Sequence, residues 1–415
     1  MGQDTPMICL FNYGGGLRGL IPAHIMAKIE HLTGLRMADM VDFFTGPSTG
    51  AILNAALTLR HPDHRNRPQY RARHLVRFYE REGANIFPHD RFRDFRGLIH
   101  DFNNRTMRLR QLNTIFRHGH YNPANLSKAL KALYGDAQLK DSLRSLVIPC
   151  YNIDGEQLEV VEEEDEGDDA PVHTKNNVSD EGGHAIWFKN ILTKTPRGVS
   201  RKTARVKLAD AVQASCAAPT FYPCHHFQTT WPETGETMEY AGIDGSIFDN
   251  PCISYLGAIR QHIPEGRKLI MIGLGTGYTH RSYKKEDWNR YGSLGVVDPV
   301  NDFPLINIFF HASESALLET FGNEMGHDLY IFNKSLVADP QEDWPSPQID
   351  DADPDNLKRM KNFAEVIIEE NQKSFDHVCD LLVRNRDNNQ ITARDKAKEW
   401  KRKLYFFTGK PRDKD

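Results

Sequence analysis

The sequence has no long hydrophobic run. Its 415 residues contain no stretch of about 18 consecutive apolar residues, so we expect no membrane-spanning helix. The first residues, MGQDTPMICLFNY, have no basic segment ahead of an apolar one and do not resemble a secretory signal. They also miss the myristoylation pattern, because Pro6 stands where Ser or Thr is required. We therefore expect neither a spanning anchor nor a secretory leader.

Cysteine is scarce, and the 6 cysteines are scattered along the chain. The closest pair, Cys216 and Cys224, has no metal-ligand spacing, and no disulfide-dense pattern is present. This usage suits a reducing cytoplasm. Internal repeats and low-complexity tracts are also missing. The apolar fraction of 39% and charged fraction of 26% are ordinary for globular proteins, which excludes a wholly disordered or collagen-like chain.

A strong positive charge is missing too. The net charge is −4 at pH 7, which gives no reason to expect a nucleic-acid polymer as a partner. The charge is unevenly spread, however. Residues 60–117 hold 14 Arg, no Lys and 6 acidic residues, which indicates either solvated helix faces or a surface near the site that attracts anionic membranes. Residues 154–169 hold 10 acidic residues and no base, so we expect residues 155–185 to form an exposed insertion.

Alternating short apolar runs and helical patterns define the fold class. The runs at residues 7–12, 41–45 and 269–274 end at or next to glycine, as expected of strands buried on both faces. Apolar residues recur at helical spacing in residues 21–33, 51–59 and 356–383. Strands alternating with helices predict an α/β protein with a largely parallel sheet.

Residues 46–50 (GPSTG) match the G-x-S-x-G pattern of a nucleophile elbow. An apolar run precedes the match and a helix-compatible segment follows it, which is the setting that the elbow requires. Such a turn exposes Ser48 above the sheet near a helix N-terminus, where developing negative charge is stabilised. The simpler alternative is a glycine-flanked turn in which Ser48 only caps the helix.

A second glycine-rich turn occupies residues 14–19 (GGGLRG). Gly14, Gly16 and Gly19 satisfy the dinucleotide-binding pattern, and Asp39 lies about 20 residues further on. Asp39, however, precedes the second strand instead of ending it, which disfavours that interpretation. Backbone N–H groups in this turn could instead form an oxyanion hole, with Arg18 adding positive field. A tight turn that needs positive φ is the structural alternative.

Asp244-Gly245 follows an apolar stretch, and a partly buried Asp there could act as a general base. Alone, this dipeptide is also a common turn. The pairs His61-x-x-His64 and His225-His226 lie in polar or proline-bearing loops, so we expect no metal site at either.

Together, and in this order, these motifs resemble the patatin-like phospholipase family. Two more stretches are similar to family sequence, QASCAAPTFYP at residues 213–223 and IGLGTG at residues 272–277, and weaker similarity continues through residues 330–383. The resemblance implies a three-layer α/β/α fold with a mostly parallel central sheet and a C-terminal helical extension. It predicts a catalytic domain at residues 5–335, and a helical extension with a basic tail at residues 336–415.

The resemblance further implies a lipid acyl hydrolase of the phospholipase A type, with an acyl-enzyme intermediate and no metal or organic cofactor. Ser48 would be the nucleophile and Asp244 its base. The N–H groups of Gly15 and Gly16 would form the oxyanion hole, with Gly14 and Arg18 beside them. The glycines that support these motifs are Gly19, Gly46, Gly50 and Gly245.

Two positions depart from the family pattern: Asn12-Tyr13 stands where an Asp commonly precedes the glycine loop, and Pro47 is unusual before the serine. Neither removes a reacting group. Three alternatives stay open, namely a catalytically silent or activator-dependent lipid-binding scaffold, a dinucleotide-binding oxidoreductase and a Ser-His-Asp esterase. The histidines that follow Asp244 and could serve the last are His262, His280, His311, His327 and His377.

The predicted substrate also sets the predicted partners and location. We expect membrane phospholipid or another glycerolipid as substrate, and we allow for an activating ligand or protein and for oligomers. The protein would be cytoplasmic and peripheral at membranes, with export by a non-classical route left open.

Overall fold

The computed structural model describes residues 6–64, 66–86, 121–154, 183–191, 193–195, 198–200, 203–219, 221–230, 235, 237–279, 283–286, 288–290, 304–337 and 343–386. Most of the predicted acidic insertion (residues 155–182), the end of the arginine-rich stretch (87–120) and the basic tail (387–415) lie outside these residues.

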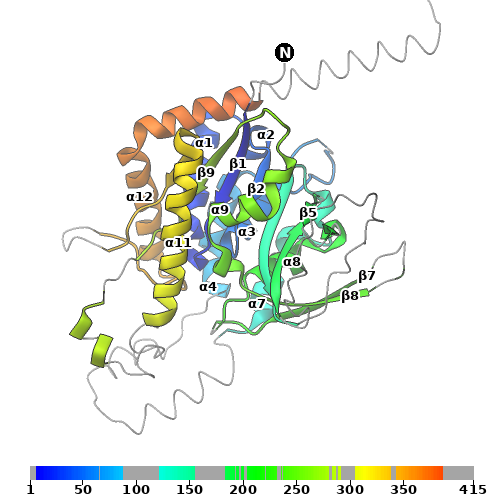
Figure 1. The fold of residues 1–415 in the computed structure, drawn as a ribbon, viewed down its shortest axis with the longest axis horizontal. Helices are drawn as coiled ribbons and strands as arrows, with labels where there is room; N and C mark the ends of the chain where they lie inside the picture. Colours follow the sequence, from blue (N-terminus) through cyan, green and yellow to red (C-terminus); the bar gives the residue numbers. More distant parts are fainter. Residues whose placement is uncertain are drawn as a thin grey trace, which may run out of the picture.

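A mixed sheet of eight strands forms the centre of the molecule (Figure 1). The strand order is β10 (Leu329–Phe332), β9 (Leu269–Leu274), β1 (Met7–Asn12), β2 (Phe43–Thr45), β3 (Ser145–Asn152), β8 (Thr237–Ile243) and β7 (His225–Thr230), with β4 (His184–Lys189) also paired to β3. The first five strands are mutually parallel, whereas β4 and β8 run antiparallel to β3, and β7 runs antiparallel to β8. The predicted α/β fold with a mostly parallel sheet is confirmed.

Helices cover both faces of this sheet, which makes three layers (Figure 1). Side chains of β1 alternate between the two faces, because Ile8 and Leu10 belong to one apolar cluster and Cys9 and Phe11 to the other. The larger cluster holds side chains of α1 (Leu20–Thr33), α3 (Thr49–Thr58), α4 (Ala72–Ile86), α7 (Pro123–Tyr134), α8 (Leu208–Ser215) and α12 (Pro354–Glu370). The smaller one is covered by α9 (Pro251–Ser254) and α11 (Pro304–Met325).

Short elements complete the described chain. They are α2 (Met37–Met40), the hairpin β5 (Thr193–Thr195) and β6 (Gly198–Ser200), the π-helical turn η5 (Tyr255–Ile259) and the 3-10 turns η1 (Gly16–Gly19), η2 (Leu139–Asp141), η3 (Thr203–Arg205), η4 (Gly245–Phe248), η6 (Arg260–His262) and η8 (Gly326–Asp328). No helix in the described ranges is long and apolar enough to cross a bilayer.

The C-terminal helical stripe is interrupted once. The pattern predicts one helix over residues 356–383, but α12 ends at Glu370 and a second helical segment covers residues 372–386. The Asn371 side chain donates to the Ile367 carbonyl at 2.9 Å, a local bond that competes with continuation of the helix. Side chains of α12 pack against α1 in the larger cluster. The predicted division of the chain at residue 336 stays a prediction.

The carboxyl edge of the parallel strands carries the two glycine motifs, and the amino edge does not. The turns after β1 and β2 carry the two glycine motifs, so both motifs lie at the carboxyl edge, where α/β proteins bind ligands. Helix α3 runs from that edge to the opposite one, where Leu59 forms a bridge with Ser142 just before β3 begins. The described loop that starts at Arg60 therefore begins at the edge opposite Ser48. Within the described part of the arginine-rich stretch, only the start, residues 60–71, lies away from Ser48, because α4 returns toward the site and its Tyr79 hydroxyl is hydrogen bonded to the Thr49 hydroxyl beside Ser48. The expectation that the stretch forms a surface near the site stays a prediction.

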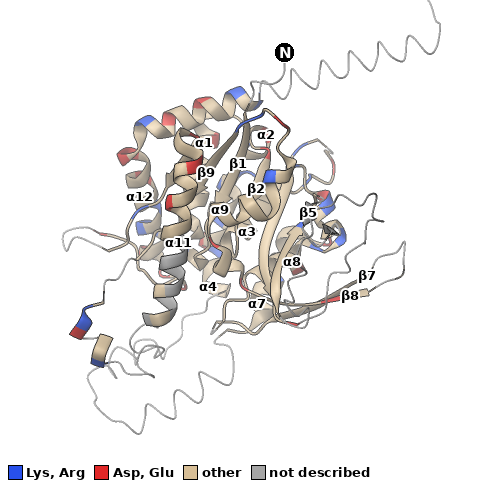
Figure 2. Ribbon diagram, in the orientation of Figure 1, with Lys and Arg blue, Asp and Glu red and all other residues tan. Residues whose placement is uncertain are grey.

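Charge follows the layers of the fold. The central strands β1, β2 and β9 have no charged residue, whereas Lys, Arg, Asp and Glu lie on the outer helices and loops (Figure 2). This arrangement leaves the three central strands apolar on both faces, as strands covered by two helical layers require.

Candidate active site

Ser48 lies in a sharp turn between β2 and α3, as the predicted strand–turn–helix setting requires. Its backbone has φ 52° and ψ −124°, and within the described ranges it is the one non-glycine residue with positive φ. Strained backbone of this kind persists only where the surrounding structure enforces it, and it concentrates at functional sites. A Cβ atom on Gly46 or Gly50 would stand about 2 Å from the Asn12 carbonyl oxygen (1.9 and 2.0 Å), so β1 leaves room there for glycine only.

Asp244 is the partner of Ser48. It lies at the end of β8, and its Oδ2 accepts a hydrogen bond from Ser48 Oγ at 3.0 Å. The other carboxylate oxygen accepts from the N–H and the hydroxyl of Ser246, both at 2.7 Å. Asp244 is only 5% exposed. Burial raises the pKa of this carboxyl from 3.8 to about 6, and the hydrogen bonds from Ser246 and Ser48 oppose the shift.

The Ser48 backbone is held by a serine that the motif analysis did not single out. The Ser48 N–H donates to Ser215 Oγ at 3.0 Å, and that hydroxyl donates onward to the Pro149 carbonyl at 2.7 Å. Ser215 lies inside the stretch QASCAAPTFYP, so only the family resemblance pointed to it. The next residue, Cys216, has its pKa raised well above the ordinary value by burial and by the nearby Asp244 charge, so its thiol stays neutral beside the site.

The two positions that depart from the family pattern take part in local hydrogen bonds, although the buried Asn12 Oδ1 has no partner among the described residues. The Pro47 carbonyl accepts the N–H groups of Gly50 and Ala51 at 2.8 and 3.3 Å, and this role does not need an N–H on Pro47. Asn12 is fully buried, and its amide donates to Asn54 Oδ1 at 2.6 Å. Asn54 in turn donates to the Thr45 carbonyl at 2.7 Å, which ties the end of β1 to α3 and β2.

The glycine loop passes directly beside Ser48. A Cβ atom on Gly14 would stand 3.4 Å from the Ser48 Cβ, at contact distance, and only 2.9 Å from Ser246 Oγ, so the loop packs closely against the site. Gly15 and Gly16 have φ values of 148° and 58°, which glycine adopts without penalty. Within the described part of the chain, the N–H groups of these two residues have no hydrogen-bond partner.

Arg18 follows the loop in η1, and its Nε atom is buried without a hydrogen-bond partner among the described residues. Burial lowers the pKa of Arg18 to about 10, while the nearby Asp249 carboxylate opposes the shift. The guanidinium therefore stays charged at neutral pH and adds positive potential to the loop.

A family model described as patatin-like phospholipase matches residues 13–256, more than half of the chain. The chain belongs to this family.

Several plant proteins are similar to this patatin-like chain over most of its length. Patatin-like protein 2 of Oryza sativa subsp. indica is 25% identical over 405 residues, covering 91% of this chain and 88% of the relative. Patatin-like protein 3 of Arabidopsis thaliana is 25% identical over 398 residues, covering 90% and 79%. Among solved structures, human GIVD cytosolic phospholipase A2 has a TM-score of 0.42 at 9% identity, covering 92% of this chain and 61% of that one.

Membership of the patatin-like phospholipases makes the chain an enzyme of a serine lipid acyl hydrolase family. The predicted family, enzyme class and fold class are thereby confirmed. The individual site residues stay predictions that rest on the geometry above.

No histidine in the described residues hydrogen bonds to Ser48 or Asp244. Of the five histidines considered for a triad, His280 and the side chain of His311 lie outside the described part. His262 ends η6, on the segment that leads into β9, and His327 lies in η8, just before β10. His377 packs against the Tyr330 ring. This arrangement gives a Ser-His-Asp esterase no support among the histidines that can be assessed.

The acid of the proposed dinucleotide pattern has another role. Asp39 precedes β2, and its carboxylate accepts the Arg36 N–H at 3.3 Å at the start of α2. It therefore does not lie beyond the second strand, where a ribose would be bound. The His61 and His64 rings lie 4.8 Å apart and are tilted by 40°, and His225 pairs with Asp210 at 3.1 Å. No group of three or more metal-ligating side chains occurs in the ranges described.

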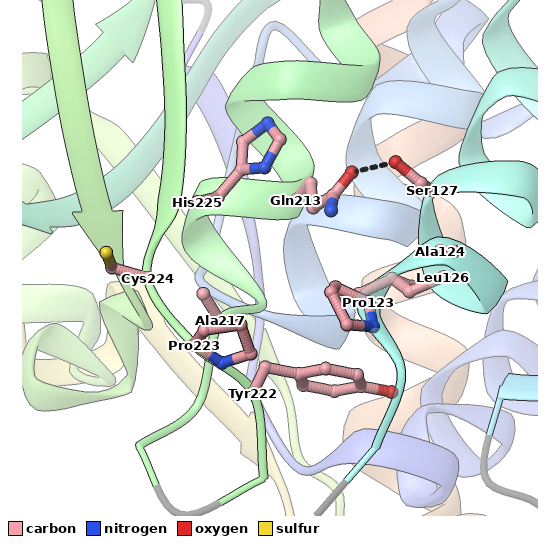
Figure 3. A pocket seen from close by; sticks show the side chains of 10 residues that line it. All are labelled: Pro123, Ala124, Leu126, Ser127, Gln213, Ala217, Tyr222, Pro223, Cys224 and His225. Carbon is pink, nitrogen blue, oxygen red and sulfur yellow. Dashed lines mark hydrogen bonds between the residues drawn. The ribbon is translucent and has the colours of Figure 1, made fainter. Parts of the chain in front are cut away.

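A cavity of about 260 Å³ lies next to the site (Figure 3). Its walls come from the start of α7, the end of α8 and the segment that leads into β7. Ser127 donates to Gln213 Oε1 at 2.7 Å across its upper part, and Tyr222 closes the lower part (Figure 3). Ala217 belongs to this wall, and its carbonyl also accepts the Asp244 N–H at 3.0 Å. A shift of the Ala217 backbone in the cavity wall would therefore move the backbone of Asp244.

Proposed function

We propose that this chain hydrolyses ester-linked fatty acids of glycerolipids in the manner of a phospholipase A, with Ser48 as nucleophile and Asp244 as its base. One observation carries the proposal: the Ser48 hydroxyl is hydrogen bonded to the buried Asp244 carboxylate at 3.0 Å on a strained turn at the carboxyl edge of the sheet. The lipid substrate follows from membership of the patatin-like phospholipases.

The first half of the reaction needs a base that is ionised at neutral pH and still able to take a proton. A pKa of about 6 meets both needs for Asp244. As Ser48 Oγ attacks the ester carbonyl, its proton passes to Asp244 Oδ2 and negative charge develops on the carbonyl oxygen. The N–H groups of Gly15 and Gly16 would receive that charge, and the Arg18 guanidinium would add to the stabilising field.

In the second half, the ester C–O bond breaks and the departing alcohol or lysolipid takes the proton from Asp244. An acyl group is left on Ser48. A water molecule then gives a proton to Asp244 and attacks the acyl carbonyl, which releases the fatty acid and returns the proton to Ser48. The Ser246 hydrogen bonds keep the carboxylate oriented through both halves.

The decisive test is release of free fatty acid from mixed phospholipid vesicles by the wild-type chain, Ser48→Ala and Asp244→Asn. We expect each variant to lose at least about a thousandfold in rate, because removing one member of a coupled nucleophile–base pair disables the unit. Asp136→Asn is the matched control, since Asp136 is a 92% exposed carboxylate paired with Lys207 on the surface. Release that survives Ser48→Ala would overturn the assignment, and no release by wild type would favour the silent or activator-dependent scaffold.

A further inference from the structure

We propose that Thr276 and Asp249 are positioning residues that aim the oxyanion-hole amides by clamping Gly14 from both sides. The inference rests on the proposed acyl-transfer function and adds two residues to it. Both lie far from Gly14 in the sequence, Thr276 just after β9 and Asp249 just after η4.

The first step concerns the peptide unit between Gly14 and Gly15. The Thr276 hydroxyl donates to the Gly14 carbonyl at 2.5 Å. In a planar trans peptide the C=O and the following N–H point in opposite directions. A hydroxyl that fixes the Gly14 carbonyl on one side therefore fixes the Gly15 N–H on the other, and this N–H has no partner among the described residues.

The second step concerns the two neighbouring peptide units. The Gly14 N–H donates to both carboxylate oxygens of Asp249 at 3.0 Å each, so the start of the loop is held. The Gly15 carbonyl accepts the Arg18 N–H at 3.1 Å, which by the same planarity aims the Gly16 N–H away from η1. The Leu17 N–H donates to the Ile349 carbonyl at 2.7 Å and closes the turn.

The third step concerns how Thr276 itself is held. It is 3% exposed, and a Cβ atom on Gly15 would stand 2.5 Å from its hydroxyl oxygen, so loop and clamp are in direct contact. The next residue, Gly277, donates its N–H to Asn333 Oδ1 at 2.9 Å, which ties the turn after β9 to the turn after β10. Thr276 lies in the stretch IGLGTG, whose resemblance to the family gave it no role.

The experiment compares Thr276→Val with Thr276→Ser, and Asp249→Ala with Asp249→Asn, beside wild type and Ser48→Ala. Valine keeps the shape of threonine but lacks the hydroxyl, whereas serine keeps the hydroxyl. Asparagine keeps one of the two acceptor oxygens of aspartate, whereas alanine keeps neither. We expect Thr276→Val and Asp249→Ala to lower kcat by about 10–100-fold with KM changed less than about twofold, because oxyanion contacts form only in the transition state. Thr276→Ser and Asp249→Asn should recover most of that loss.

Affinity for a trifluoromethyl ketone lipid analogue separates positioning from a general structural role. The adduct that this analogue forms with the serine carries the oxyanion, so its inhibition constant should rise in each variant by the factor by which kcat/KM falls. The midpoint of thermal unfolding, measured beside it, shows whether a variant has lost stability. Thr276→Val with wild-type kcat and inhibitor affinity would overturn the inference while leaving the proposed function intact. An inactive wild type, or an active Ser48→Ala, would instead overturn the proposed function and the inference with it.

Discussion

The pKa of Asp244 reflects two opposing effects, burial and hydrogen bonding. Its carboxyl is buried and carries a pKa of about 6, because burial disfavours the ionised form more than Ser246 and Ser48 favour it. Because the folded protein holds the carboxyl proton more tightly than the unfolded chain, the carboxyl adds to the free energy of unfolding, and this contribution is complete below the unfolded pKa of 3.8. The contribution is lost as the pH rises through the folded pKa of about 6. The loss amounts to about 3 kcal/mol at most. The site is therefore competent in the pH range where this residue stabilises the fold least.

The pH dependence of activity follows from the same carboxyl. We expect kcat/KM of the wild-type chain to fall about tenfold per pH unit below about pH 6, because the base must be ionised. Ser246→Ala removes a hydroxyl donor to Asp244 Oδ1, so the pKa should rise and the acidic limb should move to higher pH. Profiles measured on a soluble short-chain ester would check this without interference from a membrane. A limb that stays in place or moves to lower pH would contradict the assigned base.

At the scale of elements, the elbow depends on how closely β1 approaches α3. Gly50 lies in the first turn of α3, and a Cβ atom there would stand 2.0 Å from the Asn12 carbonyl oxygen. Gly322 also lies within a helix, α11, but a Cβ atom on it would have its nearest neighbour 3.9 Å away, at ordinary contact distance. Both glycines are therefore helical, but Gly50 has no room for a Cβ atom, whereas Gly322 does.

Alanine should have opposite effects at these two positions. Gly50→Ala should lower the free energy of unfolding by at least about 2 kcal/mol, because strand and helix must separate to admit the methyl group. Gly322→Ala should raise it by up to about 1 kcal/mol through helix propensity alone. Urea unfolding of both variants beside wild type would measure the two effects. A Gly50→Ala protein as stable as wild type would show that the close approach does not constrain the elbow.

At the scale of the whole molecule, the nucleophile and the described arginine loop lie at opposite edges of the sheet. Ser48 follows the carboxyl end of β2, whereas the loop from Arg60 to α4 begins beside the start of β3. The N–H of Ala72, where α4 begins, donates to the buried Glu30 near the end of α1, which keeps this region at the far edge. A membrane that touched the arginines of this loop, residues 60–71, would face away from the catalytic edge, whereas the later part of α4 lies beside Thr49.

Charge reversal should therefore leave catalysis unaffected. We expect Arg67→Glu and Arg73→Glu, both at exposed positions, to hydrolyse anionic vesicles within about twofold of the wild-type rate at low salt. Vesicle sedimentation and fatty acid release, measured at low and high salt, would test this. A tenfold loss confined to low salt would show instead that this edge contacts the membrane during turnover.

The sequence predicted the parts of this molecule whose causes are local. The strand–turn–helix order around both glycine motifs was predicted correctly, and the order of the motifs identified the family, whereas the break at Asn371 and the late start of β2 at Phe43 were missed. The residues that hold the site were harder to find, because Ser215 and Thr276 act through single hydroxyls from distant segments. Ile349 contributes only a backbone carbonyl, which any residue carries, so no residue pattern marks it.

The support of the glycine loop by Ile349 also orders events during synthesis. Gly14, Ser48 and Asp244 leave the ribosome well before residue 349, yet the Leu17 N–H finds its acceptor only when that residue has emerged. A growing chain thus contains Ser48 and Asp244 long before the hydrogen bond from Leu17 to Ile349 can form. Full bracing of the oxyanion loop therefore depends on a segment that is synthesised more than 300 residues after the loop itself.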